Sequence, residues 1–412
     1  MHIIQAGHNA ALARLMVAMI ADVPHDHPLL VQFREDPYPL YRYLLAAAPV
    51  QWNDVLGAWT LARFEDVVTS LTDARFSADR TERDQPDALE GYELAKSMLV
   101  SDPPDHTRMR ALVQKAFTPR MIEQLRPRII AIVRELLDRI ASRGGEFDLI
   151  ADLAYPLPVV VIAELLGVPP EDRQIFEEWS ALLAASLDPL VSADLMWRVT
   201  QARDGLHTYL RGIIAERRRE PRADLISALV AVEERGDVLS EPELVVMCTL
   251  LLIAGHETTV NLIGNGVLAL LKHPDQLGLL RGSPQLIGTA VEELLRFDSP
   301  VQMTGRVVMA PLELGGKEIP AGNFVLPLLG AANRDPAQFP EPEKLDLARS
   351  PNAHVAFGRG IHFCLGAPLA RAEGQIAIGA LVQRFRTLQL AGEPVRRDQI
   401  TLRGLKSLPL SF

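Results

Sequence analysis

Residues 357–366 read FGRGIHFCLG, a glycine-rich loop that contains one cysteine. Its three glycines let the backbone approach a flat ligand closely or adopt a positive φ. Cys364 stands just before a helix predicted over residues 367–385, where backbone amides and the helix dipole favour a thiolate. The loop therefore suits a metal-ligand sulfur, although a lone cysteine in such a turn is more commonly buried and inert. Zinc is excluded because it needs about four ligands and no second cysteine lies nearby.

A long apolar helix is predicted over residues 241–271, with Ser240 as its N-cap and a length of about 46 Å. Residues 254–259, AGHETT, put polar groups in its middle. Glu257 and Thr258 would cost several kcal/mol there if left unsatisfied, so they either pair locally or face a ligand cavity. In the local alternative, the Thr258 hydroxyl bonds the carbonyl of Ala254 and the glutamate finds a partner or water.

Two further charged pairs have helical spacing. Glu293 and Arg296 stand three residues apart on one helix face, and His106 and Arg110 stand four apart on a helix that Pro104 could start. Taken alone, the first is typical of a solvated surface pair worth under about 1 kcal/mol, and the second of a solvated basic turn.

The rest of the chain predicts a mainly α fold with minor β structure. No repeat, low-complexity tract or linker divides it, so residues 1–412 are expected to form one large domain. Residues 331–360 are irregular and rich in proline. The remaining predicted elements are helices over 119–236 and 283–297, a small N-terminal β region with a hairpin near 50–60, and short strands over 301–329.

The cysteine loop resembles the signature of the cytochrome P-450 family, matching Phe-Gly-x-Gly-x-His-x-Cys-x-Gly at every specified position. The motif at 254–259 is similar to the oxygen-binding groove of that family, and Glu293-x-x-Arg296 lies between the two, as it does in the family. The resemblance covers roughly the whole chain. It implies a single cytochrome P-450-type domain whose helices sandwich haem b (iron protoporphyrin IX).

The same resemblance assigns the site residues. Cys364 is the proximal ligand of the haem iron, Thr258 and Glu257 are the alcohol and acid that deliver protons to bound dioxygen, and Glu293 with Arg296 locks the cysteine loop onto the core. Gly255 makes room for O2. Other residues implied to touch the haem are Phe357, Gly358 and Ala254 and, at its propionates, His106, Arg110, Arg306 and His362.

The implied reaction is hydroxylation or epoxidation of a lipophilic organic substrate with O2. Electrons come from a separate ferredoxin or flavodoxin with its reductase. The docking face is expected behind Cys364 and is predicted to be basic, with Arg108, Arg110, Lys115, Arg120 and Arg359. The candidate substrate-pocket positions, for which plain hydrophobic core is the alternative, are Leu94, Leu99, Leu250, Ile253, Val301 and Met303, with Ala254 beside them.

Three other functions fit parts of this pattern. A peroxygenase or a haem-thiolate isomerase would keep the haem but would not need the Glu257–Thr258 pair. A hydrolase with Cys364 as nucleophile and His362 as base is disfavoured because the two residues are badly placed in a tight loop. A haem sensor or carrier would differ in lacking turnover.

Composition narrows the setting. The 42 Lys and Arg against 52 Asp and Glu give a net charge of -10, which argues against a general nucleic-acid binder. Cys248 and Cys364 are the two cysteines, and such sparse use fits a reducing cytoplasm. The apolar run at residues 10–21 contains Arg14 and is shorter than the roughly 20 residues of a membrane span, so neither membrane nor export is expected.

Overall fold

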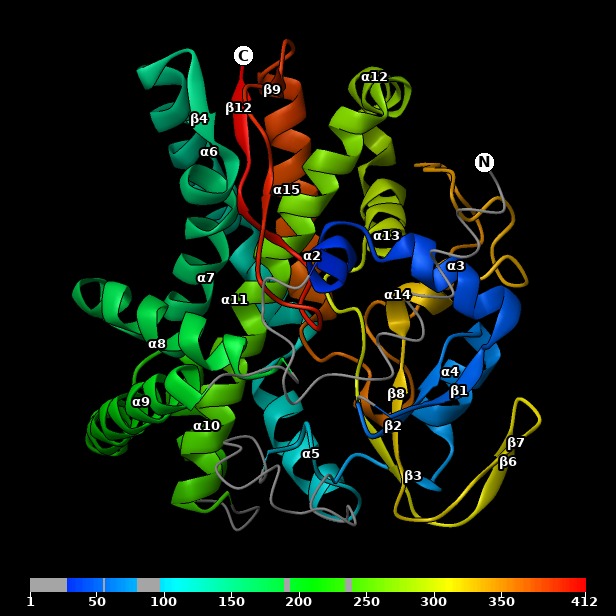
Figure 1. Cartoon of the computed structure of the whole chain (residues 1–412). Coiled ribbons are helices and arrows are strands. Elements are labelled where there is room, and N and C mark those ends of the chain that lie inside the picture. The colour runs from blue at the N-terminus through cyan, green and yellow to red at the C-terminus, as the bar shows by residue number, and fades with distance from the viewer. Residues whose placement is uncertain (1–27, 55, 80–96, 189–192, 234–238) are drawn as a thin grey trace.

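The computed structural model describes residues 28–54, 56–79, 97–188, 193–233 and 239–412 (Figure 1). The apolar run at 10–21 and the pocket candidate Leu94 lie outside these residues. Within them the chain is mainly helical with small sheets, as predicted. A large helical region occupies one side in Figure 1, and the main sheet with its short helices occupies the other.

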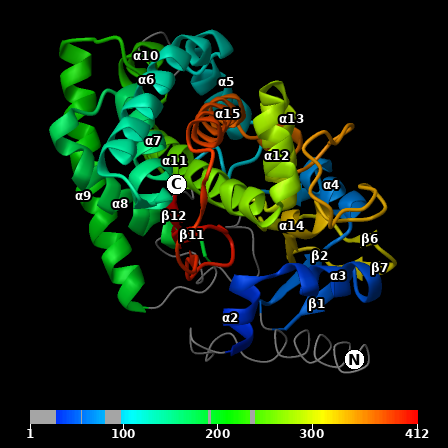
Figure 2. The same cartoon turned by 90° about the horizontal axis from the view of Figure 1, so that it is seen from above.

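Helix α11 (Glu241–Lys272) runs through the centre of the molecule (Figures 1 and 2). It begins at a capping box, in which Ser240 Oγ accepts from the amide of Glu243 and the Glu243 carboxylate accepts from the amide of Ser240 at 2.7 Å. The predicted helix and its cap are therefore confirmed. Among the described helices, α11 alone is long and apolar enough to cross a membrane, but 72% of its most apolar window is buried inside the protein.

Other helices surround α11. Helices α7, α8 and α9 pack against it on one side and α13 and α15 on the other, so that its apolar surface is covered nearly all round. The bounds are α5 (Asp105–Ala116), α6 (Pro119–Arg143), α7 (Pro156–Leu166), α8 (Arg173–Ala185), α9 (Ala193–Arg219), α10 (Leu225–Glu233), α12 (Pro274–Gly282), α13 (Ile287–Phe297) and α15 (Ala367–Arg384). Short turns of other helix types are η3 (Ile150–Ala154), η4 (Pro170–Asp172), η5 (Pro284–Leu286) and η6 (Gly360–His362).

The main sheet combines strands from two distant parts of the chain. The predicted hairpin is present as β1 (Val50–Asn53) and β2 (Ala58–Leu61), which pair antiparallel with Trp52 opposite Trp59. Strand β8 (Phe324–Pro327) joins β2 in parallel, and the strand order is β1-β2-β8-β5-β3. The other strands of this region are β3 (Phe76–Ser77), β5 (Arg306–Val308), and the hairpin of β6 (Leu312–Leu314) and β7 (Lys317–Ile319).

Helices α4 (Phe64–Thr72) and α14 (Leu329–Ala332) pack on this sheet. Helices α2 (Pro28–Glu35) and α3 (Tyr38–Ala47) form a separate apolar cluster with α14. The strands near the C-terminus were not predicted, and neither was β4, which falls inside the stretch expected to be helical. Each has two or three residues, too few to show an alternating pattern. They are β4 (Glu146–Asp148), β9 (Gln389–Leu390), β10 (Val395–Arg396), β11 (Leu405–Ser407) and β12 (Pro409–Ser411).

Candidate functional site

The cysteine loop has a fixed backbone. The Cys364 amide donates to the Phe357 carbonyl at 3.0 Å, which closes the loop on itself. Gly358 and Gly360 both have a φ of 70°, a conformation that other residues adopt at a cost. A Cβ on Gly360 would lie 2.4 Å from the carbonyl oxygen of Leu71 in α4. The loop is therefore pressed against the helix that covers the sheet.

Cys364 lies where a sulfur anion would be stabilised. Burial raises the pKa of its thiol, while hydrogen bonds from the amides of Gly366 and Ala367 and the nearby guanidinium groups of Arg110 and Arg371 oppose that rise. These amides belong to the first turn of α15, whose dipole also favours negative charge. Without a cation the thiol is the favoured form, and an iron ion bound to the sulfur would favour the thiolate.

Helix α5 brings two predicted residues to this loop. Arg110 Nη2 donates to the Phe363 carbonyl at 2.7 Å, and the ring of His106 lies 4.3 Å, centroid to centroid, from that of His362. The predicted convergence of α5 on the cysteine loop is therefore confirmed. Arg306 is buried on β5 and acts electrostatically on His362.

These four residues form a basic cluster (His106, Arg110, Arg306 and His362). Burial, with the charges of Arg306 and Arg110 and the neighbouring His106, lowers the pKa of His362 to about 3, and burial and Arg110 lower that of His106. Neither ring nitrogen of His106 has a hydrogen-bond partner, and neither has Nε2 of His362. Buried donors without acceptors are costly, so the cluster fits a ligand that carries carboxylates.

The predicted oxygen groove lies on α11. Thr258 Oγ1 donates to the Ala254 carbonyl at 3.0 Å, which is the local bond anticipated for a threonine in a helix. Ala254 is exposed in the middle of an otherwise buried helix, and Thr258 is half-buried. The role of Gly255 in making room for O2 stays a prediction. A Cβ there would lie 2.9 Å from Ile162 Cδ1, so this glycine serves the close packing of α11 on α7.

Glu257 faces away from Thr258. Its side chain is 1% exposed, and its Oε1 lies 2.7 Å from Arg397 Nη1. The neighbouring His256 puts Nε2 3.6 Å from Glu257 Oε2. Because successive helix residues are turned by about 100°, an acid next to Thr258 in sequence projects from a different face of α11. The structure thus gives the acid a partner that its sequence neighbours do not reveal.

Glu293 and Arg296 are fully buried on α13. Arg296 donates to both carboxylate oxygens of Glu293 at 2.7 and 2.8 Å, so the predicted pairing on one helix face is confirmed. Arg296 also donates to the carbonyls of Asn333 and Pro342, and Glu293 accepts from Arg349. The pair therefore holds the irregular segment that leads into the cysteine loop, rather than the loop itself.

The arrangement matches known proteins closely. The cytochrome P450 family model matches residues 61–280 and 285–409. Cytochrome P450 CYP107DY1 of Priestia megaterium is 47% identical over 372 residues, which cover 86% of this chain and 90% of that protein. The chain belongs to the cytochrome P450 family.

Two further similarities agree with this assignment. The vitamin D(3) 25-hydroxylase of Pseudonocardia autotrophica is 45% identical over 389 residues, covering 92% of this chain and 94% of that protein. The crystal structure of P450BioI in complex with an acyl carrier protein that carries hexadec-9Z-enoic acid has a TM-score of 0.88 and 42% identity, covering 93% of this chain and 100% of that one. The protein is a cytochrome P450 monooxygenase with haem as its cofactor.

The residues of this cytochrome P450 fit its cofactor. A sulfur at the first turn of α15 is suited to haem iron, and the imidazole and guanidinium donors of the basic cluster suit two propionates. Phe357 lies in the same loop, half-buried, with the Arg371 guanidinium 4.6 Å from its ring centroid. These observations support the predicted haem contacts of Cys364 and of the basic cluster.

The substrate-pocket candidates are divided by their surroundings. Leu250, Ile253 and Met303 are buried among other apolar side chains, which fits a pocket wall as well as plain core, so their role stays a prediction. Val301 is half-buried and forms a β-bridge with Leu402. Leu99 is 41% exposed.

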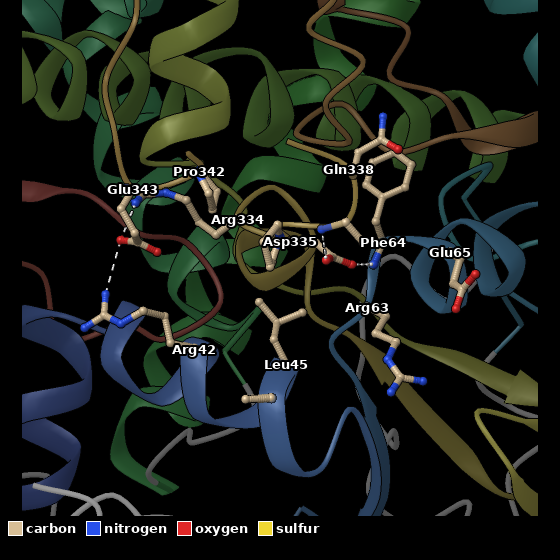
Figure 3. A pocket seen from close by; sticks show the side chains of 13 residues that line it. Arg42, Leu45, Arg63, Phe64, Glu65, Arg334, Asp335, Gln338, Pro342 and Glu343 are labelled. Carbon is tan, nitrogen blue, oxygen red and sulfur yellow. Dashed lines mark hydrogen bonds and ion pairs between the residues drawn. The ribbon is translucent and has the colours of Figure 1, made fainter. Parts of the chain in front are cut away.

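A surface hollow of about 710 Å³ lies elsewhere, between α3, α4 and residues 334–343 (Figure 3). Figure 3 shows Arg42 reaching toward Glu343, at 3.2 Å, and Asp335 accepting from the Phe64 amide at 2.8 Å. None of the predicted site residues lines it. The hollow is therefore lined by other residues than those predicted to hold the haem.

The face beside Cys364 is less basic than predicted. Arg108 is ion-paired with Glu243 of α11, and Arg110 turns inward to the cysteine loop. Lys115 and Arg120 are exposed, while Arg359 is half-buried. The loop itself presents apolar side chains, with Ile361 51% and Phe363 39% exposed. Any partner that docks here meets exposed apolar side chains, and Lys115 and Arg120 remain the predicted cations of this face.

Sequence reasoning missed two ionisable residues, the half-buried Arg397 and the buried Glu373. Arg397 stands 140 positions from Glu257, and no local pattern connects them. Glu373 did leave a signal, because it is a lone acid on an otherwise apolar face of α15. Burial raises the pKa of Glu373 to about 8, and neither carboxylate oxygen has a well-aligned hydrogen bond, although Thr259 of α11 lies beside it.

Glu373 should make the stability of the protein depend on pH. The folded state holds its proton up to about pH 8, whereas the unfolded chain releases it near pH 4.5, so stability should fall as pH rises between these values. Glu373→Gln should weaken this dependence and raise the free energy of unfolding at pH 8 by on the order of a few kcal/mol. Urea titrations from pH 5 to 8.5 measure it, with exposed Glu220→Gln as control. An unchanged pH slope in Glu373→Gln would contradict the assignment.

Proposed function

We propose that this cytochrome P450 takes two electrons from a separate ferredoxin or flavodoxin, reduces O2, and inserts one oxygen atom into a lipophilic substrate by hydroxylation or epoxidation. Two protons are consumed, and the second oxygen atom leaves as water. The observation that carries the proposal is Cys364, half-buried at the start of α15 beside Arg110 and the rest of the basic cluster. When bound, haem supplies the reduction of dioxygen and the oxygen transfer.

The protein's own residues hold the cofactor and move the protons. Cys364 binds the iron through its sulfur, and the basic cluster takes the two propionates. The Thr258 hydroxyl donates a hydrogen bond to the Ala254 carbonyl. Its oxygen remains free to accept a hydrogen bond. Glu257, which is next to Thr258 in sequence but projects from a different face of α11, is the acid that replenishes protons.

The substrate class is proposed to be lipophilic. Apolar candidates such as Leu250, Ile253 and Val301 support it, and so do two relatives, one named for vitamin D(3) and one crystallised with a fatty acyl chain on its carrier protein. Difference spectra of the haem protein with vitamin D3, hexadec-9Z-enoic acid and the same acid on acyl carrier protein test this class. Binding of the carrier-linked acid alone would indicate a carrier-delivered substrate.

The setting is also proposed. Residues 1–412 act as one domain in the cytoplasm. Cys248 and Cys364 are both free, as a reducing compartment requires, and the apolar surface of α11 is covered by protein.

Cys364 should determine the spectrum of the haem protein. An anionic sulfur opposite carbon monoxide shifts the Soret band of the ferrous carbonyl form far to the red, whereas an imidazole does not. Cys364→His should abolish this shift and keep a Soret band, and Cys248→Ala should leave the shift intact. The assignment fails if Cys248→Ala removes the band and Cys364→Ala retains it.

Thr258 should control how reducing equivalents are used. Thr258→Ala should bind substrate normally but form less product per NAD(P)H and more hydrogen peroxide, because protons reach dioxygen without control. Thr258→Ser keeps the hydroxyl and should stay coupled. Product, peroxide and NAD(P)H are measured together with a working redox chain. Equal coupling in all three proteins would remove Thr258 from the mechanism.

Reduction by a ferredoxin should depend on the cations at the edge of the face beside Cys364. Lys115→Glu with Arg120→Glu should slow stopped-flow reduction severalfold at low salt, since complementary charge chiefly raises association rates. Lys272→Glu with Lys406→Glu, the same change in net charge on other elements, should have a smaller effect. Equal slowing by both double variants, or none by either, would argue against docking on this face.

A further inference from the structure

Residues 397–402 form a strap between β10 and β11 that is fastened from two sides. Asp188, just after α8, accepts hydrogen bonds from the amides of Ile400 at 2.6 Å and Thr401 at 3.2 Å. From the other side, the Thr401 carbonyl accepts from the Gln302 amide at 2.9 Å. A buried carboxylate that takes two amides fixes the backbone of the strap.

Arg397 begins the strap and is itself held in place. Its amide donates to the Gly404 carbonyl at 3.2 Å and its Nε to the Leu405 carbonyl at 3.3 Å. The remaining end of the guanidinium group, Nη1, lies 2.7 Å from Glu257 Oε1. The Arg397 side chain is 22% exposed, so it connects the buried acid with solvent.

Arg397, rather than His256, balances the charge of Glu257. His256 is buried, and burial lowers its pKa. Its Nδ1 lies 3.1 Å from both the Leu252 carbonyl and Ser180 Oγ, contacts that a neutral imidazole can satisfy. A buried carboxylate without a cation is strongly disfavoured. The cation that lies beside Glu257 therefore comes from a residue outside α11.

We infer that Arg397 is a positioning residue for Glu257, and that the strap links this position to Asp188 at the end of α8. The inference rests on the proposed function, because it requires Glu257 to supply protons. Arg397 holds the buried carboxylate in place and connects it with solvent, the source of protons. Movement at the end of α8 reaches Glu257 through the Asp188 hydrogen bonds and Arg397.

The main test replaces the guanidinium group. The assay uses whichever of vitamin D3, hexadec-9Z-enoic acid and the carrier-linked acid is turned over fastest. Arg397→Gln should lower product per NAD(P)H at least fivefold and increase the solvent deuterium isotope effect on turnover. Arg397→Lys, which keeps the charge, should retain more than half of the coupling. The exposed Arg386→Gln, which loses the same charge, should match wild type.

Hydrogen peroxide separates positioning from general damage. Peroxide already contains the two electrons and two protons that O2 must receive, so turnover driven by it needs no supply from Glu257. Arg397→Gln should therefore stay within twofold of wild type with peroxide. An equal loss with peroxide and with O2 would overturn the inference and indicate a structural effect.

Two cycles of variants test the links without relying on turnover alone. If Glu257 and Arg397 interact, the changes in denaturation midpoint caused by Glu257→Gln and Arg397→Gln should not be additive in the double variant. Asp188→Ala should reduce coupling in the wild-type background and have no further effect in Arg397→Gln. Additive effects in either cycle would contradict the strap. Should Arg397→Gln fail to fold, Asp188→Ala carries the same coupling test.

The inference and the proposed function fail differently. The proposed function is wrong if the carbonyl spectra contradict Cys364 as the thiolate ligand. It is also wrong if Thr258→Ala remains fully coupled. If both of those tests succeed and Arg397→Gln is fully coupled, only the role of Arg397 is overturned.

Discussion

One buried ion pair, Glu293 with Arg296, holds the segment on which the haem site stands. Neither side chain reaches solvent, so each is tolerable only because the other is present, and removing one partner of such a pair typically costs 3–5 kcal/mol. Arg296 donates to carbonyls between Asn333 and Lys344, and Glu293 accepts from Asn352. The chain then needs only five more residues to reach the cysteine loop. The position of Cys364 thus depends on charges that never touch the cofactor.

The site itself is a meeting of separate elements. The cysteine loop is pressed against α4 through Gly360, and Arg110 joins it to α5. His362 then lies between His106 of α5 and Arg306 of β5, where burial suppresses the protonation of the imidazoles. Uncharged rings beside two fixed guanidinium groups give donors without an excess of buried positive charge. This balance suits two carboxylates better than a cluster of four cations would.

Motifs that depend on neighbours in sequence were predictable, and those that depend on distant residues were not. The cysteine loop, the long helix with its Ser240 cap, and the Glu293–Arg296 spacing are written locally, and each has its expected geometry. The packing of Gly255 against Ile162 was not foreseen, because a glycine near a ligand and one against another helix look alike in sequence. Arg397 lies 140 residues from Glu257, and the strands of the C-terminal sheets are too short to leave a pattern. Burial of distant charges decides these contacts, and a single sequence does not display it.

The main sheet has a consequence for how the protein is made. Strand β2 pairs in parallel with β8, and Trp59 lies opposite Val325, which is 266 residues later in the chain. The two strands cannot pair until Val325 has been synthesised. At about 5–20 residues per second, the ribosome takes on the order of 10–50 seconds to supply that partner. During this interval the N-terminal hairpin has one open edge, and isolated hairpins are at best marginally stable. Synthesis order thus leaves the first strands of the enzyme without their partner until more than three quarters of the chain has been made.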